Sequence, residues 1–115
     1  SVLGLVALRW RGAYVSTKFA LEGWADTLRL EMADTNIRVS LIEPGPVTSR
    51  IRQNSIAHFE RWIDWQASAR AEQYEAGLLQ RLYAPPKRDR FELPAEAVTK
   101  PLLHALEARR PRPRR

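Results

Sequence analysis

Tyr14 and Lys18 are the two side chains whose types and spacing are best suited to acid–base chemistry. They stand four residues apart in a stretch of helical composition, so both side chains lie on one face of a helix. A phenol exchanges its proton poorly at neutral pH, but an adjacent ammonium group stabilises the phenolate and makes the exchange easier. The pair therefore suits a general acid or base, although an exposed helix pair without a function has the same spacing.

A second candidate segment, residues 41–48, leads from a predicted strand into a Pro-Gly turn. In an open α/β sheet, ligands bind beyond the carboxyl ends of the strands. There Gly45 would let the backbone approach a flat ligand closely, and Thr48 would offer a hydroxyl. Ser1 would lie at the end of a preceding strand, on the same edge as Tyr14 and this turn. The simpler alternative for residues 44–48 is a sharp turn with no ligand.

The apolar pattern predicts the elements that position these side chains. A helix is predicted over residues 14–34, followed by turn residues 34–36 and a short strand over residues 37–42. The predicted helix has an apolar face and a polar face: Leu21, Ala25, Leu28 and Met32 form the first, and Glu22, Asp26 and Arg29 lie off it. A helix joined by a short turn to a strand indicates an α/β fold with a parallel sheet.

The second half of the chain is predicted to be mostly helical. Residues 48–82 are rich in Ala, Gln, Glu and Arg, and their imperfect apolar period favours two or more helices over one. The sequence Ala-Pro-Pro at 84–86 should end this segment. Pro94 should open a last helix that runs to about Glu107, with a kink at Pro101.

Taken together, these residues resemble the second half of the short-chain dehydrogenase/reductase family. The similarity rests on Ser1, on Tyr14 thirteen residues later in the run Tyr-Val-Ser-Thr-Lys-Phe-Ala-Leu-Glu-Gly, and on the loop Glu-Pro-Gly-Pro-Val-Thr at 43–48. The combination at these spacings is far more specific than Tyr-x-x-x-Lys alone. It covers essentially the whole chain and is most similar to the branch of hydroxysteroid and retinol dehydrogenases.

This resemblance implies a fold and an activity. The fold would be α/β, the C-terminal half of a Rossmann-like doubly wound parallel sheet, with a helical substrate-covering segment at residues 48–90. The activity would be hydride transfer between NAD or NADP and an alcohol, ketone or aldehyde. Which of the two cofactors is used stays open, because the residues that select it in the family lie upstream of the matching region.

The same resemblance implies a role for each site residue. Tyr14 would be the general acid or base, Ser1 would hydrogen-bond the reacting oxygen, and Lys18 would stabilise the Tyr14 phenolate and bind the ribose hydroxyls of the cofactor. The loop would line the nicotinamide and its neighbouring phosphate through Pro44, Gly45, Val47 and Thr48. Residues 1–115 would then form a partial domain, because the Gly-rich turn and the relay Asn of the family have no counterpart here. We therefore expect the isolated chain to be unstable or inactive.

Two surfaces of the predicted fold could bind partners. Phe59, Trp62 and Trp65 in the covering segment would favour a lipophilic substrate, although packing aromatics are the simpler explanation. In the resembling family the helix corresponding to residues 14–34 commonly packs against a partner subunit, which would make a homo-oligomer through this helix. The alternative function is a non-catalytic remnant or a domain that associates through helices.

Composition excludes several other classes. Five of the 19 basic residues are arginines within 109–115, and the other 14 nearly balance the 13 acidic residues. We therefore interpret 109–115 as a basic Arg/Pro tail, solvated and poorly ordered, and do not expect nucleic-acid binding. No stretch is long and apolar enough for a membrane span. A metal site is not expected either, because the chain has no Cys and its two histidines, His58 and His104, lie far apart in the sequence. We expect a soluble, cytoplasmic protein.

Overall fold

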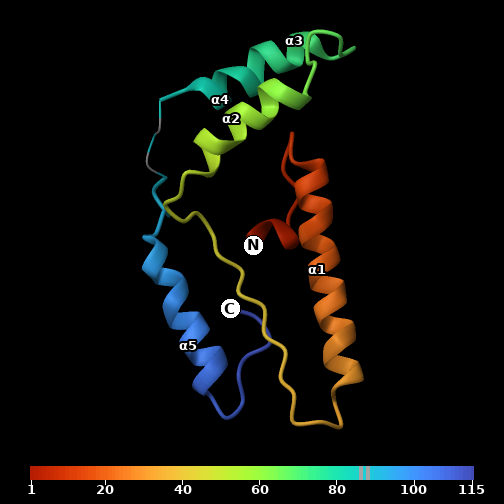
Figure 1. The fold of residues 1–115 in the computed structure, drawn as a ribbon, viewed down its shortest axis with the longest axis vertical. Coiled ribbons are helices and arrows are strands. Elements are labelled where there is room, and N and C mark those ends of the chain that lie inside the picture. Colours follow the sequence, from red (N-terminus) through yellow and green to blue (C-terminus); the bar gives the residue numbers. More distant parts are fainter. Residues whose placement is uncertain (86, 88) are drawn as a thin grey trace. The chain divides into compact units, whose positions relative to one another are not determined.

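The computed structural model describes residues 1–85, 87 and 89–115, and the chain divides into two compact units. The first unit comprises Ser1–Val47 and Phe91–Arg115, and the second comprises Thr48–Arg90. Figure 1 shows the helices of both units along the chain.

The first unit is built around α1, Gly12–Glu31. A single 3-10 turn, η1 (Val2–Gly4), precedes it, and η3 (Ala95–Val98) and α5 (Thr99–Glu107) follow late in the chain. The predicted helix over residues 14–34 is thus confirmed, but it begins two residues and ends three residues earlier than predicted. It ends where Thr35 Oγ1 donates to the Met32 carbonyl and accepts from the Ile37 N–H, so the Thr35 hydroxyl replaces the next helical turn.

The expected parallel sheet is not present among the described residues, and that part of the fold prediction is wrong. The chain is 54% helical and 4% strand. Residues 37–47 are extended, but they form only two isolated parallel bridges, Leu41 with Arg114 and Val47 with Leu93. The Rossmann-like arrangement expected from the sequence is therefore replaced by a helical chain with a short paired segment.

The composition of the C-terminal segment explains why the pairing stays short. Leu41 donates to the Pro113 carbonyl and accepts from the Arg115 N–H, as in a parallel ladder. The next rung would need an N–H from Pro113, which proline lacks. The Val39 carbonyl accepts instead from Arg29 Nε at 2.9 Å, so an α1 side chain takes the place of the missing strand bond.

The second unit contains α2 (Ile51–Trp62) and a second helical stretch made of α3 (Ala71–Gln73), the π-helical η2 (Tyr74–Leu79) and α4 (Gln80–Tyr83). The expectation of two or more helices in this region is confirmed. The rings of Phe59 and Tyr74 pack with centroids 6.4 Å apart, and the Tyr83 hydroxyl donates to Glu60 at 2.9 Å. The helix ends at Ala84, which is extended; Pro86 of the predicted break lies outside the described residues.

Very little apolar surface is fully buried. Ala25 of α1 is the one buried hydrophobic residue among those described, and the accessible surface is 9542 Å². Several large apolar side chains of α1 are open to solvent, among them Trp24 at 61% and Leu30 at 79% exposure.

Candidate functional site

The first turns of α1 bring the Tyr14 and Lys18 side chains together. The Lys18 ammonium lies over the Tyr14 ring, with Nζ 5.1 Å from the ring centroid, which is within cation–π range. Tyr14 is 39% exposed, and its hydroxyl has no hydrogen-bond partner within the described part of the chain. The phenol is therefore accessible to a ligand and has a positive charge beside its ring.

Ser1 begins a segment that contacts both α1 and the loop at 44–47. Its hydroxyl caps η1 by accepting from the Leu3 N–H at 3.3 Å, while the Val2 N–H donates to the Pro44 carbonyl at 3.4 Å. On the other side, η1 packs on α1 so closely that a Cβ added to Gly4 would lie 3.1 Å from the Lys18 carbonyl oxygen. The segment of Ser1 thus contacts both the Pro44 loop and the turn of α1 that carries Lys18. The hydrogen bonds of the described residues include none between Ser1 and Tyr14.

The loop itself leaves room for a ligand at Gly45. A Cβ added there would meet no atom within 4 Å. The loop is anchored at its start by the Val2 bond and at Pro46, whose carbonyl accepts from the Leu93 N–H at 3.0 Å. Val47 is half-buried beside Leu93, and Thr48 is the first residue of the second unit.

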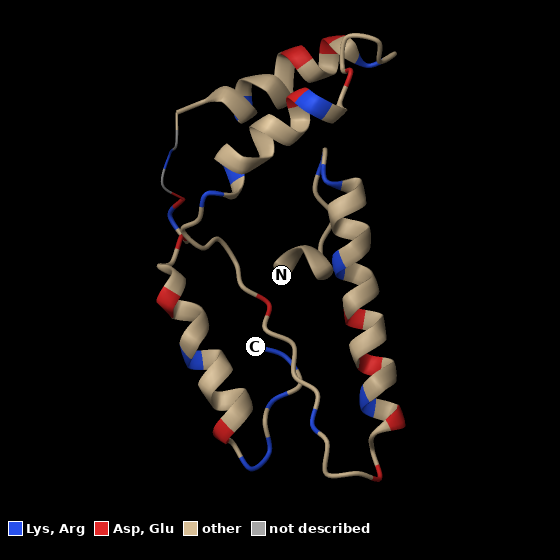
Figure 2. Cartoon of the chain, viewed as in Figure 1, with Lys and Arg blue, Asp and Glu red and all other residues tan. Residues whose placement is uncertain are grey.

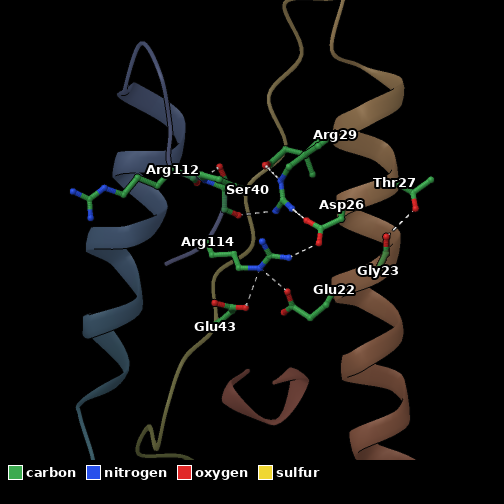
Figure 3. Close-up of polar contacts among 11 residues, drawn as sticks. Glu22, Gly23, Asp26, Thr27, Arg29, Ser40, Glu43, Arg112 and Arg114 are labelled. Carbon is green, nitrogen blue, oxygen red and sulfur yellow. Dashed lines mark hydrogen bonds and ion pairs between the residues drawn. The ribbon is translucent and has the colours of Figure 1, made fainter. Parts of the chain in front are cut away.

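Sequence reasoning missed a cluster of charged residues next to this loop (Figure 3). The Arg114 guanidinium lies between carboxylates of α1 and of the extended segment: Nε is 3.0 Å from Glu22 Oε2 and 3.8 Å from Glu43 Oε1, and Nη2 is 2.6 Å from Asp26 Oδ2. Arg29 pairs with Asp26 from the next turn of α1. The carboxylates of Glu22 and Asp26, one helical turn apart, were the signal in the sequence that could have indicated a cationic partner.

The cluster corrects two expectations. Segment 109–115 is not a free, poorly ordered tail, because residues 112–115 pair with residues 40–43 through Ser40, Leu41 and Glu43. The inner face of α1 is also not the purely apolar one expected: Glu22 and Arg29 are half-buried on the side of Ala25, whereas Leu21 is exposed. Figure 2 shows acidic positions along α1 and basic positions along the C-terminal segment, the charge pattern that this pairing requires.

The two glutamates of the cluster have opposite pKa changes. Burial, together with the hydrogen bond and the charge of Glu22, raises the pKa of Glu43. Burial also opposes the ionisation of Glu22, but its hydrogen bonds with Glu43 and Arg114 outweigh this and hold the Glu22 pKa below its ordinary value. The hydrogen bond from Arg114 likewise lowers the pKa of Asp26. Of the two neighbouring carboxyl groups, Glu43 is thus the harder to ionise, and its ionised form is disfavoured by the charge of Glu22.

The aromatic residues of the second unit are divided between packing and exposure. Phe59 and Trp65 are half-buried. Phe59 packs on Tyr74, so packing explains the presence of an aromatic residue at position 59. Trp62 is 68% exposed and is covered on one side by the Arg61 guanidinium, 4.8 Å from its ring centroid. The hydrogen bond to Glu60 raises the pKa of Tyr83 in the same unit.

The described residues contain no group of three or more His, Cys, Asp or Glu side chains arranged to hold a metal ion. Within the same residues, no helix has the length and apolar character needed to cross a bilayer.

Comparison with known proteins agrees with the motif. A family model described as short chain dehydrogenase matches residues 1–59, just over half of the chain. The uncharacterized oxidoreductase YbbO of Escherichia coli (strain K12) is 52% identical over 54 residues, which are 47% of this chain and 20% of that protein. The probable short-chain type dehydrogenase/reductase VdlC of Helicobacter pylori is 43% identical over 61 residues, 53% of this chain and 22% of that protein.

A mammalian relative also matches this region. Retinol dehydrogenase 8 of Homo sapiens is 39% identical over 57 residues, which are 50% of this chain and 18% of that protein. The chain covers about a fifth of the length of each of these relatives. No solved structure matches it. The matched residues include Ser1, Tyr14, Lys18 and the loop at 44–48, and the chain belongs to the short-chain dehydrogenase/reductase family.

Proposed function

We propose that this chain carries the catalytic residues of an NAD(P)-dependent oxidoreductase, with Tyr14 as the general acid or base. The observation that carries the proposal is the contact of the Lys18 ammonium with the ring of an accessible Tyr14. The contact places a positive charge directly beside the side chain that would exchange a proton with the substrate. Family membership supports the same assignment.

Lys18 and the loop at Gly45 would suit the binding of a nicotinamide cofactor. A ligand can approach the backbone at Gly45 without obstruction, and the Lys18 ammonium has no ion-pair partner within the described residues, so it remains available to hydroxyl groups. In this proposal Pro44, Gly45, Val47 and Thr48 line the cofactor, and Lys18 binds its ribose. When bound, the cofactor donates or accepts the hydride. Tyr14 then transfers a proton to or from the substrate oxygen, and the Ser1 hydroxyl hydrogen-bonds that oxygen.

A lipophilic alcohol, ketone or aldehyde is the proposed substrate class. The exposed ring of Trp62 and the half-buried Trp65 offer apolar surface in the second unit. One relative is named a retinol dehydrogenase, and retinol is a lipophilic alcohol. Comparable turnover of small polar sugars and of retinoid-like or steroid-like carbonyls would argue against this substrate class.

A second candidate function, association through α1, is favoured by the apolar side chains that the helix exposes. Leu21 and Trp24, neighbours on the helix surface, are 43% and 61% exposed. Such surface is typical of a helix that packs against another chain, and a homo-oligomer would cover it. This function is compatible with catalysis, and it would be the remaining one if the chain were a non-catalytic remnant.

The test is the binding of NADH and NADPH to the protein expressed from its complete reading frame, followed by their oxidation with a panel of lipophilic ketones and aldehydes. Saturable cofactor binding and turnover are expected. Replacing Lys18 with Met should weaken cofactor binding, because the ammonium that would hold the ribose is removed. If neither cofactor binds, the oxidoreductase proposal is wrong and association through α1 remains.

A further inference from the structure

We propose that Arg114 is a positioning residue that fixes the loop at 44–47 relative to α1, an inference that rests on the function proposed for that loop. Arg114 contacts Glu22 and Asp26 on α1, the helix that carries Tyr14 and Lys18. It also faces Glu43, the residue directly before Pro44. One guanidinium therefore joins the helix of the candidate catalytic pair to the start of the candidate cofactor loop (Figure 3).

The carboxyl groups on the two elements need a cation between them. The side chains of Glu22 and Glu43 are only 13% and 11% exposed, so water screens them weakly. Two neighbouring carboxylates in such surroundings repel each other, and the fork of Arg114 neutralises this repulsion while it bonds Glu22 and Asp26 through different nitrogens. Without Arg114, the repulsion would push residue 43, and with it the loop, away from α1.

The backbone on both sides of Arg114 holds it in register with the loop. Leu41 donates to the Pro113 carbonyl at 2.9 Å, and Glu43 donates to the Arg115 carbonyl at 2.6 Å. The residue after Glu43, Pro44, accepts from the Val2 N–H. A continuous set of contacts thus runs from Arg114 through Glu43 and Pro44 to the segment that carries Ser1.

Arg112 provides a matched control in the same segment. Its carbonyl accepts from the Ser40 hydroxyl at 2.9 Å, a bond that a change of side chain leaves intact. Its guanidinium points away from α1 in Figure 3, and it has no ion pair within the described residues. Arg112→Ala and Arg114→Ala therefore remove the same charge from the same segment, and only the second removes the contact with Glu22, Asp26 and Glu43.

The experiment compares Arg114→Ala, Arg114→Lys and Arg112→Ala in the protein from its complete reading frame, without any cofactor. Hydrogen–deuterium exchange is followed in peptides that cover residues 1–8 and 39–47, and circular dichroism checks that the helices persist. Arg114→Ala should accelerate exchange in both peptides by about tenfold, the scale of a lost charge-assisted hydrogen bond. Arg112→Ala should stay within about twofold, and Arg114→Lys, which keeps the charge but loses the fork, should lie between them.

A rescue separates positioning from a general loss of stability. In Arg114→Ala, the added change Glu43→Gln removes the repulsion and gives Glu22 an amide donor, so exchange at 39–47 should slow again. Equal effects of the Arg112 and Arg114 substitutions, or no rescue by Glu43→Gln, would overturn the proposal. If Arg114→Ala loses its helices, Arg114→Lys is compared with Arg112→Ala instead. Faster exchange at 39–47 in Arg114→Lys than in Arg112→Ala would then support the proposal, and equal exchange would overturn it.

The consequence for the proposed function is measured separately. Arg114→Ala should raise the KM for the cofactor more than it lowers kcat, because the loop is displaced and Tyr14 stays on α1. A fall in kcat with an unchanged KM for the cofactor would contradict the positioning role. If the wild-type protein binds no cofactor, the proposed function fails, while the exchange result still decides whether Arg114 holds the loop.

Discussion

Replacing Gly4 and Gly23 with alanine should change the stability of the protein in opposite directions, because Gly4 is closely packed and Gly23 is not. A Cβ added to Gly4 would lie 3.0 Å from Glu22 Oε1 and 3.1 Å from the Lys18 carbonyl oxygen, whereas one added to Gly23 would meet nothing within 4 Å. Gly23 lies in the interior of α1, where alanine stabilises a helix by about 0.5–1 kcal/mol. At Gly4 the gain in backbone entropy of about 0.4–1 kcal/mol is smaller than the cost of overpacking, about 1–3 kcal/mol.

The expected changes can be converted into exchange rates of the α1 amides. Gly23→Ala should slow the exchange of amides near the middle of α1 by about two- to fivefold. Gly4→Ala should accelerate exchange in η1 and around Lys18 by about fivefold, because a helical carbonyl cannot move away without breaking the helix. Hydrogen exchange monitored by NMR measures both without requiring a two-state transition. Slower exchange in Gly4→Ala would refute the close packing of η1 on α1.

Three further predictions concern the charged cluster and the packed positions. Because the pKa of Glu43 is raised in the folded protein, the ionised form of Glu43 lowers the free energy of unfolding. Lowering the pH from 7 towards 4.5, the ordinary pKa of a glutamate, should therefore stabilise the wild type relative to Glu43→Gln, as measured by urea denaturation. A stability difference between the two proteins that does not change with pH would contradict this. The lowered pKa values of Glu22 and Asp26 act in the other direction, so acid should remove their stabilisation only below their ordinary values of 4.5 and 3.8. Ala25→Leu should lower the unfolding free energy by about 1–3 kcal/mol, since Ala25 is 0% exposed, whereas Ala20→Leu on the exposed face should change it by less than about 0.5 kcal/mol.

The local parts of the fold could be predicted from the sequence. The helix at Gly12–Glu31 follows from composition and from the turn residues after it, and the Tyr14–Lys18 spacing indicated the contact that the structure shows. Both depend on residues within a few positions of each other, where helical geometry decides which side chains meet.

The parts that failed depend on residues far apart in the sequence. The face of α1 that packs inward contains Glu22 because Arg114, 92 positions later, pairs with it. A local apolar pattern places a charged residue outside and cannot show such a partner. The strand predicted at residues 37–42 needed neighbours with free N–H groups, and Pro113 interrupts the pairing that the described chain offers.

The proposed role of Tyr14 is tested most directly by the turnover of Tyr14→Phe beside Tyr83→Phe, both in the protein from its complete reading frame. The two substitutions remove the same hydroxyl, but the Tyr83 hydroxyl already donates to Glu60, and Tyr83 is not one of the proposed site residues. We expect Tyr14→Phe to lower kcat by about 10²–10⁴-fold with little change in cofactor binding, and Tyr83→Phe to retain activity. Equal activity of Tyr14→Phe and the wild type would contradict the assignment of Tyr14 as the proton-transferring residue.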